Sequence, residues 1–253
     1  DEVADPRVYA EILRQWSSLH PEFTYLPRKF KIAVSAAPDD RAAIQIHDIG
    51  LEVKRNEAGE TGFGVFVGGG LGRSPFIAKK LRDFLPEAEL LSYCEAILRV
   101  YNLFGRRDNK YKARVKILLH EAGTEEISRQ VEEEYEAIRA QGRLTLPQAE
   151  IDRIRAYFAP PELEELPARS ARLDAAAASD EGLRRFVERN LVPHKVAGYG
   201  IVTISLKAIG AVPGDVTSDQ MEAIADIAER YSADELRVSH EQNLVLPHVK
   251  LDD

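Results

Sequence analysis

The sequence is short of residues on which several classes of protein depend. It contains one cysteine, one methionine and one tryptophan among 253 residues. The single cysteine, Cys94, excludes a disulfide within the chain, which favours a reducing compartment. No run of about eighteen apolar residues occurs, so a membrane-spanning helix is excluded, and no charged and then apolar leader of the secretory type is present. We therefore expect a protein of the cytoplasm with no membrane partner.

The charge balance is acidic, with 34 lysines and arginines against 42 aspartates and glutamates and a formal net charge of -8. Nucleic-acid binding normally uses positive charge that is spread over a surface, so this balance argues against a nucleic-acid partner. Hydrophobic residues make up 44% of the chain, which is enough for a real core and, at this length, for two domains. The basic residues that do cluster therefore need an explanation.

The first basic cluster, residues 26–31, runs into alternating apolar residues. In a strand, successive side chains point to opposite faces, so Lys29 and Lys31 would share one face while Phe30 enters the core. Two neighbouring ammonium groups repel each other, and they are stable only in open water or against an anion. The segment is therefore either a solvated edge strand, whose lysines discourage association between sheets, or part of an anion site.

The second basic cluster, residues 106–116, has cations at every second position from Lys110 to Lys116. Lys112 and Arg114 complete this alternation, which predicts a strand with one cationic face. Guanidinium groups grip carboxylates in pairs, so such a face suits a ligand with several carboxylates. Nucleic acid is the rival ligand, and the acidic balance of the chain disfavours it.

A glycine loop, Gly68, Gly69 and Gly70 followed by Gly72, interrupts an apolar strand. Glycines at such a junction allow a close approach of the backbone to a ligand, and a helix is expected directly after the loop, at 76–84. The spacing fits neither the dinucleotide fingerprint nor the phosphate-loop pattern. Taken alone, the loop is equally consistent with a plain tight turn.

Apolar spacing predicts an α+β protein. We expect strands within 31–67, and beyond the helix at 76–84 we expect others at 6–19, 87–104, 125–140 and 147–158. Residues 159–179 have no periodicity and form the candidate linker. After it come a predicted strand at 201–207, a helix that begins at the capping box of Thr217 and Gln220 and runs to 230, and strands at 236–239 and 244–246. No histidine or cysteine spacing predicts a metal site.

In combination, these segments resemble the siroheme-dependent sulfite and nitrite reductases, above all the haemoprotein of assimilatory sulfite reductase. The stretches that carry the resemblance are 25–35, 47–51, 67–72, 101–116, 190–206 and 236–249. The resemblance implies a siroheme domain, with a mixed sheet and flanking helices, at 1–158. A linker with a helix would follow at 159–190, and one ferredoxin-like half-domain, the second repeat, at 191–253.

The resemblance also implies roles for individual residues. Lys29 and Lys31 match the lysines that hold the substrate oxyanion and supply protons. The cations expected at the rim of the cofactor, siroheme, are Arg28, Arg107, Lys110, Arg114 and Lys116. Backbone atoms of Gly68, Gly69 and Gly70 would pass near siroheme, and Gln242 and Asn243 lie in the second repeat where the first repeat binds it.

The function implied is part of a six-electron reduction of sulfite to sulfide. Lys31 favours sulfite, because plant nitrite reductases usually carry asparagine there; nitrite reduction and a non-catalytic anion- or tetrapyrrole-binding module are the alternatives. A four-iron cluster needs four cysteine ligands, which this chain lacks, so we expect an interior fragment that is inactive by itself. Its partners would be the small oxyanion, a ferredoxin or flavoprotein donor, and the remainder of the reductase polypeptide.

Overall fold

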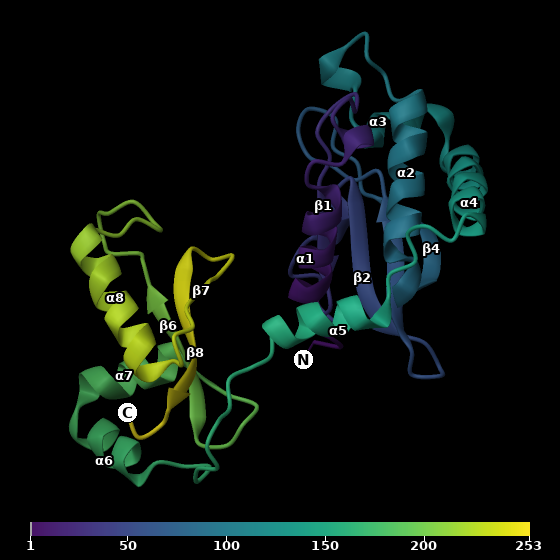
Figure 1. Ribbon diagram of the computed structural model, residues 1–253. Helices are drawn as coiled ribbons and strands as arrows, with labels where there is room; N and C mark the ends of the chain where they lie inside the picture. The colour runs from purple at the N-terminus through teal and green to yellow at the C-terminus, as the bar shows by residue number, and fades with distance from the viewer. Residues whose placement is uncertain (1) are drawn as a thin grey trace. The chain divides into compact units, whose positions relative to one another are not determined.

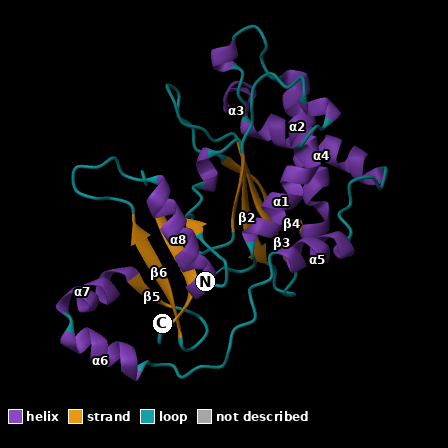
Figure 2. Ribbon diagram, turned by 60° about the vertical axis from the view of Figure 1, so that its left-hand side comes forward, coloured by secondary structure: helices purple, strands orange, loops and turns teal. Residues whose placement is uncertain are grey.

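The computed structural model describes residues 2–253, and the chain divides into two units, Asp1–Ala159 and Pro160–Asp253 (Figure 1). Each unit has its own four-stranded sheet with helices beside it (Figure 2). The α+β class expected from the sequence is confirmed. Within the described residues, no helix combines the length and the apolar character that crossing a bilayer requires.

The sheet of the first unit has the order β1-β2-β3-β4. Its strands are β1 (Ile32–Ser35), β2 (Ile49–Arg55), β3 (Thr61–Val67) and β4 (Lys79–Pro86). β1 runs parallel to β2, whereas β2, β3 and β4 are antiparallel neighbours. The sheet is therefore mixed, and the connection between β1 and β2 brings the end of the first basic cluster beside the start of β2.

Helices supply most of the remaining core of this unit. They are α1 (Pro6–Ser17), α2 (Leu90–Phe104), α3 (Val115–Ala122), α4 (Thr124–Ala140) and α5 (Gln148–Tyr157). Most of α2 is buried and the helix packs against α4, whereas α1 packs against β1 and α5 (Figure 1). Apolar residues at helical spacing explain why α1, α2, α4 and α5 form close to where the sequence predicts them.

Three predictions for the first unit are wrong. The strand expected to carry Lys29 and Lys31 on one face begins only after them, at Ile32. Residues 76–84, expected to be a helix, form a loop and then the start of β4. Pairing with the edge of β3 satisfies the backbone hydrogen bonds of β4, and a local apolar pattern contains no information about this distant partner. The cationic strand expected at 110–116 is instead a 3-10 turn, Lys110–Lys112, followed by α3. The Asn109 side chain accepts the Tyr111 amide and starts that turn, and Val115 and Leu119 are buried on one face of α3.

The sheet of the second unit has the order β5-β6-β8-β7, from β5 (Leu191–Pro193), β6 (Tyr199–Ser205), β7 (Arg237–Val238) and β8 (Asn243–Lys250). Both β6 and β7 are antiparallel to β8, so they run parallel to each other with β8 between them. α8 (Ser218–Tyr231) connects β6 to β7. The predicted capping box at its start is confirmed, with Thr217 and Gln220 bonded reciprocally.

Two helices lie within 159–190, where the sequence predicts an aperiodic linker followed by a helix. α6 (Ala171–Ser179) occupies the alanine-rich part of the stretch that was expected to lack structure, and α7 (Glu181–Asn190) follows. Ser170 and Asp180 cap these helices by accepting backbone amides. High alanine propensity and a good cap favour a short helix without a regular apolar pattern, which is why periodicity missed α6.

Candidate functional site: a cationic cleft in the first unit

The first unit contains an open cleft of about 550 Å³ whose charged lining residues are all basic. It lies between the loop that follows β3, the 3-10 turn at Lys110–Lys112 and the start of α3. Its lining consists of Arg28, Leu71, Gly72, Arg73, Ser74, Lys110, Tyr111, Arg114, Lys116 and Ile117. Four of the seven cations that the sequence predicts to be functional therefore meet in one cavity, although the strand expected to align them does not form.

Arg114 is held by a buried carboxylate. Its Nε donates to Oδ1 of Asp48 over 3.2 Å and its Nη2 donates to Oδ2 over 2.8 Å, in the two-pronged geometry that suits a guanidinium. Asp48 is 0% exposed, and its Oδ2 also accepts the backbone amide of Lys31 over 3.0 Å. A buried carboxylate without such partners would be strongly destabilising, so this ion pair is part of the fold of the cleft.

Lys116 lines the cleft, but its ammonium group is hydrogen-bonded within the chain. Its Nζ donates to the carbonyls of Leu71 over 2.8 Å and Ser74 over 2.6 Å, and it lies 3.5 Å from that of Gly70. The residue is only 7% exposed. Burial lowers the pKa of this ammonium group, and the nearby Arg114 charge lowers it further. Lys116 therefore fixes the loop that forms one wall of the cleft.

The other three cations that line the cleft have no ion-pair or hydrogen-bond partner within the described residues. Arg28, Arg73 and Lys110 are exposed, and none of their side chains forms a hydrogen bond or ion pair with another residue in 2–253. Lys110 lies over the ring of Tyr111, at 5.3 Å from its centroid. Three unpaired cations around one cavity without a lining acid favour a ligand with more than one negative charge.

Arg107 and the two lysines lie outside this lining. Arg107 donates to the Tyr25 carbonyl over 2.9 Å and to Oδ1 of Asn102 over 2.6 Å, so it braces the loop after α2. Lys29 and Lys31 are exposed and follow Arg28 directly. Their roles toward a substrate stay predictions. What the structure adds is the bond from the Lys31 amide to Asp48, which ties this segment to Arg114.

The three buried glycines support the cleft from behind. The amides of Gly68, Gly69 and Gly70 donate to backbone carbonyls of this unit, each over 2.9 Å, so these N–H groups are engaged within the chain. A Cβ at Gly69 would lie 2.3 Å from the Gln45 carbonyl oxygen, and one at Gly70 would lie 2.9 Å from Cδ of Lys116. Glycine is required here for close packing, and the predicted approach of this backbone to siroheme stays a prediction.

Gln242 and Asn243 belong to the second unit. Gln242 is exposed at a positive φ of 60°, and Asn243 is buried with its side-chain oxygen accepting from Lys207. Both line a mainly apolar cavity of about 550 Å³ near the start of α8. Their predicted contact with siroheme stays a prediction.

Sequence reasoning missed two polar residues that build the cleft. The sequence pattern includes Asp48 only within the stretch 47–51, although an aspartate directly before a buried strand is a signal for a structural carboxylate. The Tyr101 hydroxyl lies 2.7 Å from the Ala113 carbonyl and 3.1 Å from that of Arg28, and it joins both basic segments to α2. Burial raises the pKa of Tyr101 to about 12, so this hydroxyl keeps its proton.

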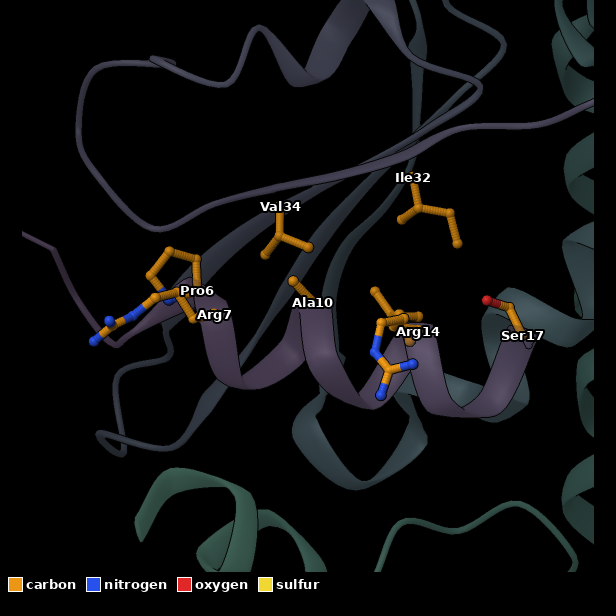
Figure 3. Close-up of a pocket in the computed structure, with 8 residues that line it drawn as sticks. Pro6, Arg7, Ala10, Arg14, Ser17, Ile32 and Val34 are labelled. Carbon is orange, nitrogen blue, oxygen red and sulfur yellow. The ribbon is translucent and has the colours of Figure 1, made fainter. Parts of the chain in front are cut away.

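Another cavity of the first unit, of about 390 Å³, lies between α1 and β1 (Figure 3). Ile32 and Val34 project toward the helix, where Val34 faces Ala10, and Arg14 also lines the cavity. Arg14 is bound to Glu11 by two hydrogen bonds, of 2.7 and 2.6 Å. Arg7, the other arginine of the lining, is paired with Asp5, so this cavity lacks the unpaired charge that distinguishes the cationic cleft.

The donor set of the chain does not fit an iron–sulfur cluster. Cys94, the only cysteine, is buried in α2, and burial raises the pKa of its thiol to about 12. A four-iron cluster needs four thiolates. Among residues 2–253 there is also no group of three histidine, cysteine, aspartate or glutamate side chains that could hold a metal ion.

Fold and cleft together define an α+β protein with a cavity whose charged lining residues are all basic. A family model described as the nitrite and sulphite reductase 4Fe-4S domain matches residues 1–138, and one described as the nitrite/sulfite reductase ferredoxin-like half domain matches 197–253. Since the first match alone covers more than half of the sequence, the chain belongs to the nitrite and sulfite reductase family. The family resemblance identified from the sequence is thereby confirmed.

Individual relatives include both kinds of reductase. The chain is 26% identical to a chloroplastic ferredoxin–nitrite reductase of Arabidopsis thaliana, covering 99% of this chain and 37% of the relative. It is 27% identical to sulfite reductase [ferredoxin] 1 of Mycolicibacterium paratuberculosis, covering 100% of this chain and 39% of the relative. The chain thus spans less than two fifths of the length of these curated relatives.

A solved structure, that of the Mycobacterium tuberculosis NirA protein, has the same fold. The TM-score is 0.65 at 24% identity, and the match covers 99% of this chain and 38% of the NirA chain.

Proposed function

We propose that this chain is part of an assimilatory sulfite reductase that reduces sulfite to sulfide with six electrons at siroheme. The observation that carries the proposal is the cleft in which Arg28, Arg73 and Lys110 have no partner within the described residues. A tetrapyrrole with acetate and propionate groups is an anion of matching character. A smaller anion with a single negative charge would neutralise only one of these three cations.

The residues present fit the acidic rim of siroheme. Arg28 and Lys110 would bind its carboxylates directly, and Arg114 would do so with the guanidinium edge that Asp48 leaves free. Lys116 would contribute indirectly, because its ammonium group already holds the carbonyls of Leu71 and Ser74. When bound, siroheme would pass electrons from the donor to the substrate and provide the site at which the substrate is reduced.

Lys29 and Lys31 are the residues of this chain that we assign to the substrate. Both ammonium groups are exposed, next to the cleft residue Arg28 in sequence. Fixed positive charge beside a small oxyanion stabilises the charge that develops as each oxygen leaves. Each oxygen departs as water and needs two protons, which ammonium groups at this position can donate and regain from solvent.

Nitrite is the second candidate substrate, because the curated relatives include nitrite reductases at nearly the same identity as sulfite reductases. Lys31 favours sulfite, since plant nitrite reductases usually carry asparagine there. The electron donor we propose is a ferredoxin, as the names of the relatives indicate for those proteins. The four-iron cluster would use cysteines outside this chain.

Substrate preference is tested by Lys31→Asn in the full-length reductase. We expect turnover of sulfite to fall on the order of tenfold more than turnover of nitrite, because sulfite carries more negative charge for the missing ammonium to neutralise. Steady-state rates with each substrate measure this. Lys112→Gln, which removes an exposed cation outside the cleft lining, is the matched control. Equal losses on both substrates would remove the preference for sulfite.

The purified 253-residue chain tests the need for the rest of the polypeptide. It lacks cluster cysteines, so we expect no reduction of sulfite when reduced methyl viologen supplies the electrons. The full-length protein, measured in parallel, should show the visible bands of siroheme and reduce sulfite. Turnover by the isolated chain would contradict the assignment of the cluster to another part of the polypeptide.

A further inference from the structure

Asp48 joins the three segments that the sequence singles out. Its side chain accepts the Lys31 amide and pairs with Arg114, and its carbonyl accepts the Gly68 amide over 2.9 Å. These partners lie in the first basic cluster, the second basic cluster and the glycine loop. No other residue in the described chain is bonded to all three.

The pair with Asp48 also decides which way Arg114 points. Asp48 occupies Nε and Nη2, so the N–H groups of Nη1 are left without a hydrogen-bond partner in the described chain. Nη1 lies where a Cβ on Gly70 would approach to 3.1 Å, so the absence of a side chain there keeps this edge clear. Arg114 itself lines the cleft, with 20% of its side chain exposed.

We infer that Asp48 is a positioning residue for anion binding, which orients the guanidinium of Arg114 toward the cleft and anchors Lys31 directly before β1. This rests on the proposed function, because it assumes that the cleft binds an acidic tetrapyrrole. Asp48 itself brings negative charge close to the cleft, so its net effect on an anionic ligand has two opposite contributions. Orientation strengthens binding, whereas simple charge repulsion weakens it.

The sign of one substitution separates the two contributions. Asp48→Asn keeps the size of the side chain and one acceptor oxygen but removes the charge. If orientation dominates, affinity for an anionic tetrapyrrole falls, on the order of tenfold, as the two-pronged pair is lost. If charge alone matters, affinity rises. Uroporphyrin I, a metal-free tetrapyrrole with acetate and propionate groups, is the probe, and its fluorescence is titrated with the 253-residue chain.

Double substitutions distinguish positioning from general damage to the fold. Arg114→Gln should weaken probe binding about as much as Asp48→Asn, and combining them should cost no more than the larger single effect. Lys110→Gln should weaken binding by the same factor in the presence and absence of Asp48→Asn, because Lys110 does not contact Asp48. Asp108→Asn, which removes an exposed acid from the same basic segment, is the charge control and should not weaken binding.

Three outcomes are informative. Weaker binding by Asp48→Asn that is non-additive with Arg114→Gln supports the inference. Unchanged or tighter binding, while Arg114→Gln still weakens it, overturns the inference and leaves the proposed function standing. If neither Arg114→Gln nor Lys110→Gln weakens binding, the cleft is not the tetrapyrrole site and both fail. Should Asp48→Asn not fold by circular dichroism, Arg114→Lys decides, because it keeps the charge without the fork; retained affinity would overturn the inference.

Discussion

Arginines on the helix surfaces and cations in the cleft behave differently in this molecule. On α4, Arg129 pairs with Glu126 and with Glu133, one helical turn to either side. On α7, Arg184 pairs in the same way with Glu188 over 2.6 Å. In the cleft, Arg28, Arg73 and Lys110 have no such partner within the described residues. Similar side chains are thus neutralised locally in one region and left open in the other.

The difference shows that pairing, more than the number of cations, marks a binding surface. Exposed pairs at helical spacing contribute little to stability, and they leave a surface close to electrically neutral. Unpaired cations gathered around a cavity repel one another, so they are kept at a cost that an anionic ligand can offset. An acidic protein can therefore still present a strongly basic site.

The largest expected effect tests the open cations themselves. Replacing both Arg28 and Lys110 by glutamine should lower uroporphyrin affinity on the order of a hundredfold, since each charge near a partly enclosed site contributes about 1–1.5 kcal/mol. Fluorescence titration of the 253-residue chain measures this. The same titration with Arg129→Gln and Arg184→Gln, on the paired helix surfaces, should change affinity less than about twofold. A comparable loss from the helix variants would abolish the distinction between the two regions.

A smaller effect, on the pH dependence of folding stability, is expected from two histidines of the second unit. The Val196 amide donates to Nδ1 of His194 over 2.8 Å, Nε2 of His194 lies 3.3 Å from Nδ1 of His248, and Nε2 of His248 lies 3.0 Å from Glu235. Burial lowers the pKa of His194 below 6.5, and the His248 charge lowers it further. His194 is therefore neutral in the folded unit near pH 7, unlike the cations of the cleft.

The sign of the pH effect follows from that lowered pKa. Below about pH 6.5 the unfolded chain binds a proton that folded His194 resists, so folding stability is full at pH 7.5 and falls as the pH decreases. The loss should be at most about 1 kcal/mol, because His194 is only partly buried. Native-state hydrogen exchange of β6 and β8, corrected for intrinsic rates, measures it. His194→Gln should flatten the dependence; an unchanged slope would assign it to other groups.

The smallest effect is expected from an exposed helix pair. Arg153 on α5 bonds to Glu150 over 2.6 and 2.9 Å, with 59% of the arginine side chain exposed. Arg153→Gln should change the free energy of unfolding by less than about 0.5 kcal/mol, as for other solvated pairs. Urea denaturation of the 253-residue chain measures it. A loss above about 1 kcal/mol would show that the helix pairs are more than a solvated surface.

Local signals predicted much of the fold. The helices α2, α4 and α8 follow from apolar spacing and, for α8, from the capping box of Thr217, because these interactions lie within a few residues of one another. The prediction failed where a distant partner overrides the local pattern, as in β4. Periodicity at 110–116 wrongly indicated a strand, although Lys110, Arg114 and Lys116 of that pattern line one cavity.

The sequence by itself determined the family of this protein and the two basic clusters, since both depend on residue type and order. Only the tertiary structure decided which cations are open to a ligand. Arg114 meets Asp48 across 66 residues, and Lys116 meets the Ser74 carbonyl across 42. Partners so far apart in the chain are brought together by strand pairing and helix packing. Which cations of the cleft are paired and which stay unpaired is therefore decided by the fold.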